Sequence, residues 1–225
     1  MSETARAFGE RAIDGSYTMT FTVSGATLAK DAGISLAISG TNAGLFSIDE
    51  SSLSATSNAV ATTTITVTYS PDAVGSHSAT ITISSTGATN KTVALSGSVS
   101  NYTLTWDFTT GGSSSETAGT HYTAGGSVTH GAALTYPSNA SMSKNGYTFT
   151  GWSSTPTTMP GNNLTITAQW EAKQYTVTLD NKSATTSGST SVTATFDAVL
   201  PTITPPTKPG YRFDGYWTEA SNGTK

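Results

Sequence analysis

The chain has 225 residues and a net charge of −4, with 35% hydrophobic and 11% charged residues. This balance excludes a highly charged disordered tail, and the ten dispersed Lys and Arg residues offer no basic stripe for nucleic acid. No apolar run approaches the roughly 20 residues of a membrane helix, so no membrane insertion is expected, and zero Cys excludes disulfides and thiolate sites.

The first residues, Met1–Thr4, lack the positive and apolar regions of a signal peptide. We therefore expect either a cytoplasmic protein or an excised piece of a longer one. Among secreted chains, zero Cys is typical of a bacterial surface protein rather than a small eukaryotic ectodomain, which usually needs disulfides.

Strict alternation of apolar residues with Thr or Ser begins at Tyr17. Period two places alternate side chains on opposite faces of a strand. The pattern recurs in five segments, separated by turns rich in Gly, Asn and Pro: 17–23, 34–38, 65–69, 81–83 and 93–95. Several short strands with regular turns predict a β-sandwich, with Phe46 and Tyr69 as core aromatics.

Short motifs in this region follow a family-specific order. They are Phe8-Gly9, Phe21-Thr22-Val23, the 40–46 segment Gly-Thr-Asn-Ala-Gly-Leu-Phe, Thr68-Tyr69-Ser70-Pro71, the 75–81 segment and Leu95-Ser96-Gly97. Together they resemble a bacterial immunoglobulin-like family of the abnormal-spindle/hydin type, found in choice-of-anchor surface proteins. The resemblance covers about residues 4–99 and implies an immunoglobulin-like sandwich, which we place at 1–99.

A different module follows and is repeated. Tyr102–Asp107 returns as Tyr175–Asp180, and Gly146–Trp152 returns as Gly210–Trp217. In the first copy, alternation predicts strands at 102–108, from 127, at 147–149 and at 164–170. We expect a flexible turn or loop at 111–115 and one helical turn at 131–135, before Pro137.

The Gly-Tyr-Thr-Phe-Thr-Gly-Trp segment at 146–152 and Thr167-Ala168-Gln169-Trp170 resemble the Listeria–Bacteroides repeat of internalin-like surface proteins. The resemblance implies a small β-grasp-like unit. We place copy one at 102–170 and copy two at 174–225, and expect copy two to be truncated because nothing in it corresponds to Leu164–Trp170. That loss leaves an unpaired sheet edge and an open core.

Four aromatics of the module are candidate ligand contacts: Trp152, Trp170, Tyr216 and Trp217. Exposed Trp and Tyr can stack on sugars or anchor a partner protein. The alternative is that they fill the core of a small unit, and the family positions of Trp152 and Trp170 favour the core.

Residues for catalysis or metal binding are not found in a working arrangement. The three His residues lack the spacing of a zinc site, and we expect all of them at solvated positions. Asp49 and Glu50 are strand neighbours and point to opposite faces. No nucleophile elbow or phosphate loop is found. We expect no enzyme, no metal and no cofactor.

We expect a non-enzymatic spacer segment of a bacterial cell-surface or secreted multidomain protein, located outside the cell and monomeric as a fragment. The linkers 98–101 and 171–174 are short, so we expect neighbouring domains to rotate little relative to each other. Two alternatives stay open. One is an adhesion module that binds a glycan or host protein through aromatics or a sheet edge; the other is an accessory domain of a surface glycoside hydrolase.

Overall fold

The computed structural model describes residues 5–218, so Met1–Thr4, on which the expectation about a leader rests, lie outside it. The chain is mainly β, as predicted. It forms two compact units. The first comprises Met1–Trp106, Thr117–Tyr136 and Ser154–Ile166, and the second comprises Asp107–Glu116, Pro137–Ser153 and Thr167–Lys225.

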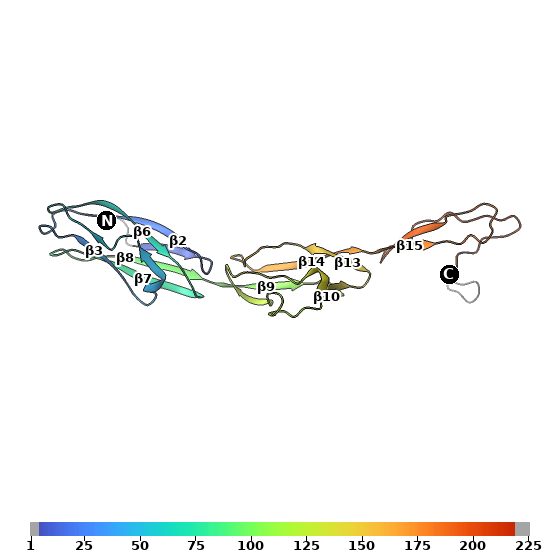
Figure 1. The fold of residues 1–225 in the computed structure, drawn as a ribbon, viewed down its shortest axis with the longest axis horizontal. Coiled ribbons are helices and arrows are strands. Elements are labelled where there is room, and N and C mark those ends of the chain that lie inside the picture. The colour runs from blue at the N-terminus through green and yellow to red at the C-terminus, as the bar shows by residue number, and fades with distance from the viewer. Residues whose placement is uncertain (1–4, 219–225) are drawn as a thin grey trace. The chain divides into compact units, whose positions relative to one another are not determined.

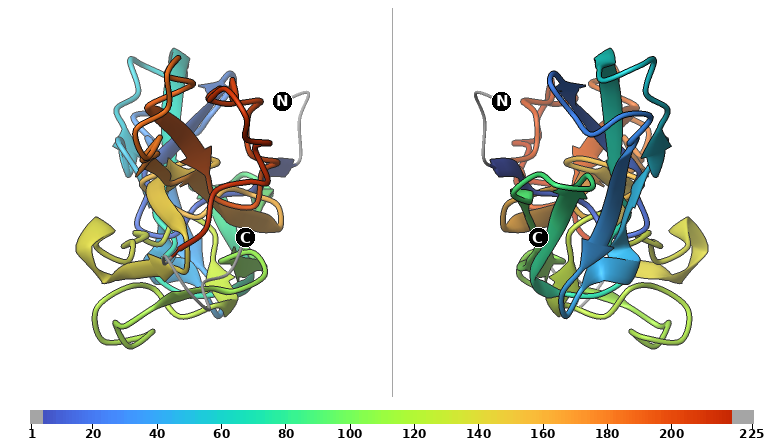
Figure 2. Two further views of the ribbon diagram at one scale, coloured as in Figure 1. Left: turned by 90° about the vertical axis from the view of Figure 1, so that its right-hand side faces the viewer. Right: turned by 90° about the vertical axis from the view of Figure 1, so that its left-hand side faces the viewer.

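The N-terminal part of the first unit is a two-sheet sandwich (Figures 1 and 2). One sheet has the order β1-β8-β7-β3-β5 and the other β2-β6-β4. Strand β1 pairs with β8 in parallel and the other pairings are antiparallel. The strands are β1 Ala5–Glu10, β2 Tyr17–Gly25, β3 Ile34–Ser39, β4 Phe46–Ile48, β5 Ser52–Leu53, β6 Val60–Tyr69, β7 Gly75–Ser84 and β8 Lys91–Val99, with a 3-10 turn η1 at Ala43–Leu45.

The predicted alternation determines which side chains form the core. In β2, Phe21 and Val23 are buried while the intervening Thr residues are exposed. Ile65 and Val67 of the partner strand β6 are fully buried on the same inner face. Apolar residues from both sheets form one cluster, so the sandwich is held together mainly by burial of this inner layer.

An aromatic group lies at the end of the sandwich core, as predicted for Phe46 and Tyr69. Their rings stack with centroids 4.8 Å apart, and Phe8 lies 5.2 Å from Tyr69. The Tyr69 hydroxyl bonds His77 Nδ1 at 2.6 Å. Gly97 lies against this ring: a Cβ there would be 2.4 Å from Tyr69 Cε1, so only glycine fits.

His77 is therefore not at a solvated position, contrary to the prediction. Its side chain is 6% exposed because it lies inside the sandwich, where its ring nitrogen satisfies the Tyr69 hydroxyl. Burial in turn raises the pKa of Tyr69.

The first module contains a four-stranded sheet of order β11-β9-β14-β13 and a two-stranded sheet β10-β12. Its strands are β9 Asn101–Asp107, β10 Gly112–Ser114, β11 Gly126–Thr129, β12 Met142–Lys144, β13 Tyr147–Trp152 and β14 Leu164–Ala172. The four strands predicted for this copy are all present. Leu104 of β9 and Ile166 of β14 are buried, in agreement with their inward parity.

Two local predictions for this module are wrong. Residues 131–135 form no helical turn, because Gly131 and Leu134 donate their backbone N–H groups to Met159 and Thr157 carbonyls. The helical turn is a 3-10 turn, η2, at Asn139–Ser141, after Pro137. Within the predicted flexible turn 111–115, Gly112–Ser114 is strand β10, paired with β12.

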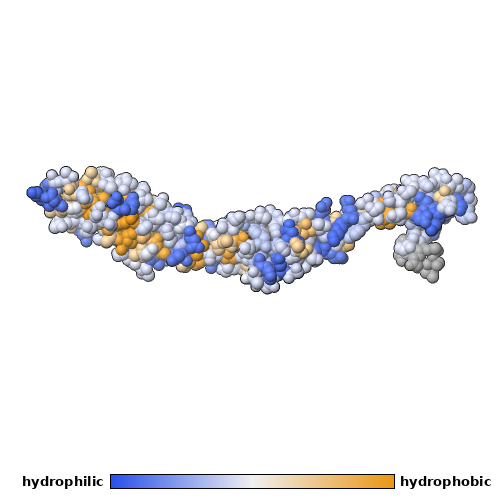
Figure 3. All heavy atoms as spheres, viewed as in Figure 1, coloured by the Kyte–Doolittle hydropathy of each residue, from blue (hydrophilic) through white to orange (hydrophobic). Residues whose placement is uncertain are grey.

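The second copy contains a two-stranded antiparallel sheet, formed by β15 Gln174–Thr178 and β16 Ser191–Thr195. It is coloured orange to red and faces the viewer in the left panel of Figure 2. Residues 211–217, which correspond to β13, are not in a strand. Several large hydrophobic side chains of this copy are exposed: Tyr175, Val177, Val199, Leu200, Tyr211, Phe213 and Trp217. Figure 3 shows small patches of hydrophobic surface in this part of the chain.

Candidate functional site

The four predicted contact aromatics lie in two places. Trp152 and Trp170 both contact Phe149, with ring centroids 5.1 and 5.3 Å apart, and both are partly buried. Trp170 Nε1 also donates to the Phe108 carbonyl at 3.2 Å. These contacts make Trp152 and Trp170 part of the packing of the first module.

Tyr216 and Trp217 belong to the second copy. The Tyr216 hydroxyl donates to Asn181 Oδ1, which fixes that ring against the loop after β15. Trp217 is 51% exposed. The structure therefore does not gather the four predicted aromatics into one binding surface.

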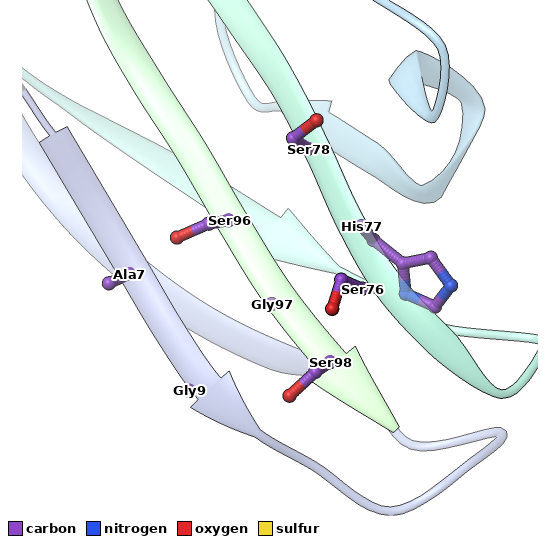
Figure 4. A pocket seen from close by; sticks show the side chains of 8 residues that line it. All are labelled: Ala7, Gly9, Ser76, His77, Ser78, Ser96, Gly97 and Ser98. Atoms are coloured by element: carbon purple, nitrogen blue, oxygen red, sulfur yellow. The ribbon is translucent and has the colours of Figure 1, made fainter. Parts of the chain in front are cut away.

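Two shallow depressions lie on the sandwich. The one in Figure 4, of about 370 Å³, is lined by small residues of β1, β7 and β8, chiefly Ser76, Ser96 and Ser98. His77 belongs to its wall, but its ring points to the inner face of the sheet, where it bonds Tyr69. The second depression, of about 740 Å³, is lined by residues of 31–35, 52–55 and 84–86. In neither depression does an acid and base pair meet.

Among residues 5–218, no group of three or more His, Cys, Asp or Glu side chains could hold a metal ion. Across the same residues, no helix has the length and apolarity needed to cross a membrane.

A more specific arrangement lies where the sandwich meets the first module. We call it joint 1 and define it by Glu10, Ile13, Tyr102 and His130. The Tyr102 hydroxyl donates to both carboxylate oxygens of Glu10, at 2.6 and 2.7 Å. His130 Nδ1 lies 3.2 Å from Glu10 Oε1, and its ring meets Tyr102 edge-on.

Backbone hydrogen bonds also stabilise joint 1. Ile13 N donates to the His130 carbonyl at 2.9 Å, and His130 N donates to the Ser100 carbonyl at 2.9 Å. Gly131 adopts φ +88°, and a Cβ there would be 2.5 Å from the Ala12 Cβ. The segment after β1 is therefore packed directly on the turn after β11.

Joint 1 should weaken at alkaline pH. The hydrogen bond to Glu10 raises the pKa of Tyr102, helped by burial and by the charge of Glu10. A raised folded-state pKa gives stability that is complete below the ordinary tyrosine value of about 10 and lost as pH rises through the folded value. An NMR titration of the Tyr102 ring should show ionisation at lower pH in Glu10→Gln. Identical titrations in the two proteins would contradict this assignment.

A second contact, joint 2, connects the two copies and is defined by Gly146, Tyr147, Lys173, Phe196 and Asp197. The Tyr147 hydroxyl donates to Asp197 Oδ2 at 3.0 Å, and this bond raises the pKa of Tyr147. The Phe196 ring meets Tyr147 edge-on at 5.5 Å and covers Gly146. Lys173 N donates to the Gly146 carbonyl at 2.8 Å.

The two joints use the same position of the module. Thr129 pairs with Asn101 in copy one, and Thr195 pairs with Gln174 in copy two. The next residues, His130 and Phe196, are therefore equivalent. Their backbone N–H groups donate to equivalent linker carbonyls, those of Ser100 and Lys173. In both copies, the residue after the second strand packs on the preceding domain.

Sequence reasoning did not identify these joint residues. Glu10 and Tyr102 are 92 positions apart, and Tyr147 and Asp197 are 50 apart, so no local pattern connects them. One signal was available: an aromatic ring, His130 or Phe196, follows the second strand of each copy.

Comparisons with known proteins agree with the repeat organisation. The model of the Listeria-Bacteroides repeat domain matches residues 102–171 and 175–225, more than half of the chain. Internalin H of Listeria monocytogenes serovar 1/2a (strain ATCC BAA-679 / EGD-e) is 33% identical over 93 residues. That match covers 37% of this chain and 16% of internalin H, so the chain spans a small part of that relative's length.

Among solved structures, a family 123 glycoside hydrolase from Clostridium perfringens, studied for glycolipid glycan hydrolysis, covers 47% of this chain and 26% of its own. The identity is 8% and the TM-score 0.34, a likeness too low to support an inference.

Proposed function

Because the chain belongs to the Listeria-Bacteroides repeat domain family, we propose that it is a non-enzymatic spacer segment of a bacterial cell-surface or secreted multidomain protein. The family match and the similarity to a segment of internalin H support a surface-protein repeat module. As a spacer, the segment would also hold its neighbouring domains at a defined separation.

The proposal includes the domain organisation. An immunoglobulin-like sandwich occupies 1–99, and β-grasp-like repeats occupy 102–170 and 174–225. The two-sheet arrangement with one inner core supports the sandwich assignment. The matched ranges of the repeat family support the other two.

The spacer role is supported mainly by one observation: in both joints, hydrogen bonds and ring contacts connect neighbouring domains. A freely jointed chain would have polar linkers without contacts between domains. Here one carbonyl of each linker, that of Ser100 or of Lys173, accepts a backbone hydrogen bond from the adjoining module, and each joint adds a tyrosine–carboxylate hydrogen bond. Charge-assisted bonds of this kind are stronger than neutral ones and orient both partners. Each joint therefore limits the angles open to the domains that it connects.

The test is a distance measurement across joint 1. The chain has no Cys, so Ser51→Cys and Thr120→Cys give two unique spin-label sites, both exposed. Pulsed electron paramagnetic resonance should give one narrow distance distribution. Adding Glu10→Ala and His130→Ala should broaden it, because the side-chain bonds that join Glu10 to Tyr102 and His130 are lost.

The matched control for the joint 1 measurement is Glu171→Ala, which removes an exposed carboxylate that makes no contact in joint 1. This control should keep the narrow distribution. A distribution that is already broad without the joint substitutions would overturn the spacer proposal.

Adhesion through exposed aromatics is the second candidate. It is favoured by Tyr211 and Trp217, which are 74% and 51% exposed, and it would place the ligand on the second copy. The two functions differ in what they require: a spacer depends on the joints, whereas an adhesin depends on the aromatic surface.

A further inference from the structure

The first and last strands of the sandwich lie side by side. β1 and β8 are neighbours in the five-stranded sheet and pair in parallel. The ladder runs from Ala5, opposite Ala94, to Glu10, opposite Ser98, and Arg11 N extends it by donating to the Ser98 carbonyl at 2.8 Å. The chain therefore enters this domain along one strand of a parallel pair and leaves it along the other.

Both strands of this pair are also held by the rest of the sandwich. Arg6 of β1 is buried, and its Nε donates to the Thr20 carbonyl of β2, in the opposite sheet, at 2.9 Å. Phe8 of β1 is 2% exposed, and its ring lies 5.2 Å from that of Tyr69. β8 pairs with β7 on its other side. Neither strand can slide along the other without losing these contacts.

The first module has the same arrangement of its end strands. β9 and β14 are its first and last strands, and they are neighbours in the four-stranded sheet. Thr103 N, near the start of β9, donates to Oδ1 of Asn163, just before β14, at 2.8 Å. Trp170 Nε1, towards the end of β14, donates to the carbonyl of Phe108, just after β9. Since start lies beside start and end beside end, these two strands also run parallel.

Parallel end strands resist tension because of the direction in which they are loaded. A force along the chain pulls the first strand backwards and the last strand forwards, so the two must slide past each other. The hydrogen bonds of a ladder connect one strand to the next, so sliding loads them all together, and closely packed buried side chains resist it as well. When both attachment points lie at the same end of a ladder, the force instead opens the bonds one after another.

We propose that the sandwich and the first module are tension-bearing domains, in which a force along the chain is carried in shear by the β1–β8 and β9–β14 ladders. This inference rests on the proposed spacer function and adds to it the resistance of each domain to stretching. Forced unfolding is governed by the unfolding rate, so the barrier to separating these strand pairs determines that resistance.

The test compares two pulling directions on the sandwich. The chain has no Cys, so Asn90→Cys, exposed and just before β8, provides a unique attachment point. Pulling between the two chain termini shears β1 against β8, whereas pulling between the N-terminus and the Asn90→Cys site opens the same ladder from one end. In single-molecule force spectroscopy at constant force, the sandwich should unfold at least about tenfold more slowly when sheared, because several bonds break together. The chain length released, about 3.4 Å per residue, identifies the domain that unfolds.

The first module allows the same comparison. Asn101→Cys and Asn162→Cys replace exposed residues at the start of β9 and just before β14. Pulling between these two sites opens the β9–β14 ladder from one end. The module should then unfold at least about tenfold faster than under tension between the chain termini.

Arg6→Ala tests the anchor of β1 on the opposite sheet. Loss of the hydrogen bond from Arg6 to the Thr20 carbonyl should raise the unfolding rate of the sandwich under end-to-end tension about tenfold. The matched control is Arg212→Ala, which removes an exposed arginine of the second copy and should leave that rate unchanged.

Equal unfolding rates in the two pulling directions would overturn the tension-bearing role of the domain that is tested. The comparison of directions on the sandwich changes no buried residue, so it stands even if Arg6→Ala fails to fold. The two proposals also fail separately, because spin-label distances report the joints, whereas the pulling direction reports the ladders inside each domain.

Discussion

Replacing Tyr69 with alanine should lower the free energy of unfolding of the sandwich by about 3–5 kcal/mol, the range for a buried aromatic residue. The side chain is 0% exposed and contacts Phe8 and Phe46, so its removal leaves a cavity between the two sheets. It also leaves His77 Nδ1 without its partner. Urea unfolding, monitored at amides of β6 and β7, measures the loss.

Two variants separate the causes of the Tyr69 effect. Tyr69→Phe keeps the ring and removes the hydroxyl, and should cost about 1–3 kcal/mol for the unsatisfied buried group. Tyr211→Ala removes an equally large but 74% exposed side chain and should change stability by less than about 0.5 kcal/mol. Equal losses in Tyr69→Ala and Tyr211→Ala would contradict the proposed packing.

The strands were predictable because their signal is local. Period-two alternation identified β2, β3, β6, β7 and β8 and the core position of Tyr69, since burial of one face is specified within each strand. The helical turn predicted at 131–135 is wrong because helix propensity competes there with pairing to 157–159, a partner distant in the sequence.

The contacts of joint 1 could not be predicted from the sequence. Joint 1 depends on Glu10 meeting Tyr102, and no local rule selects that pair of residues from the other carboxylates and tyrosines. The similar backbone of the two copies at Gly146 and Gly210, both with φ +77°, is visible only in the structure.

Gly146→Ala should open joint 2. Gly146 has φ +77°, which costs an alanine about 1–2 kcal/mol. A Cβ there would also lie 2.3 Å from the Phe196 ring, so the ring must leave its place on Gly146 and Tyr147. The shift separates Tyr147 from Asp197 as well, since Asp197 follows Phe196 directly.

The repeat supplies a matched control for Gly146→Ala. Gly210 has the same φ of +77°, but a Cβ there would meet no atom within 4 Å. Gly210→Ala therefore carries the same backbone strain without the contact with Phe196. A difference between the two variants in the distance between the two copies is therefore caused by the lost contacts of joint 2 and not by backbone strain at the glycine.

The central claim, that side-chain and backbone contacts hold neighbouring modules in fixed relation, is tested most directly at joint 2. Spin labels at Thr150→Cys and Thr202→Cys, both exposed, report the distance between the two copies. We expect a narrow distribution in the otherwise unchanged chain and in Gly210→Ala, and a broad one in Gly146→Ala. Equal widths in all three proteins would contradict the claim.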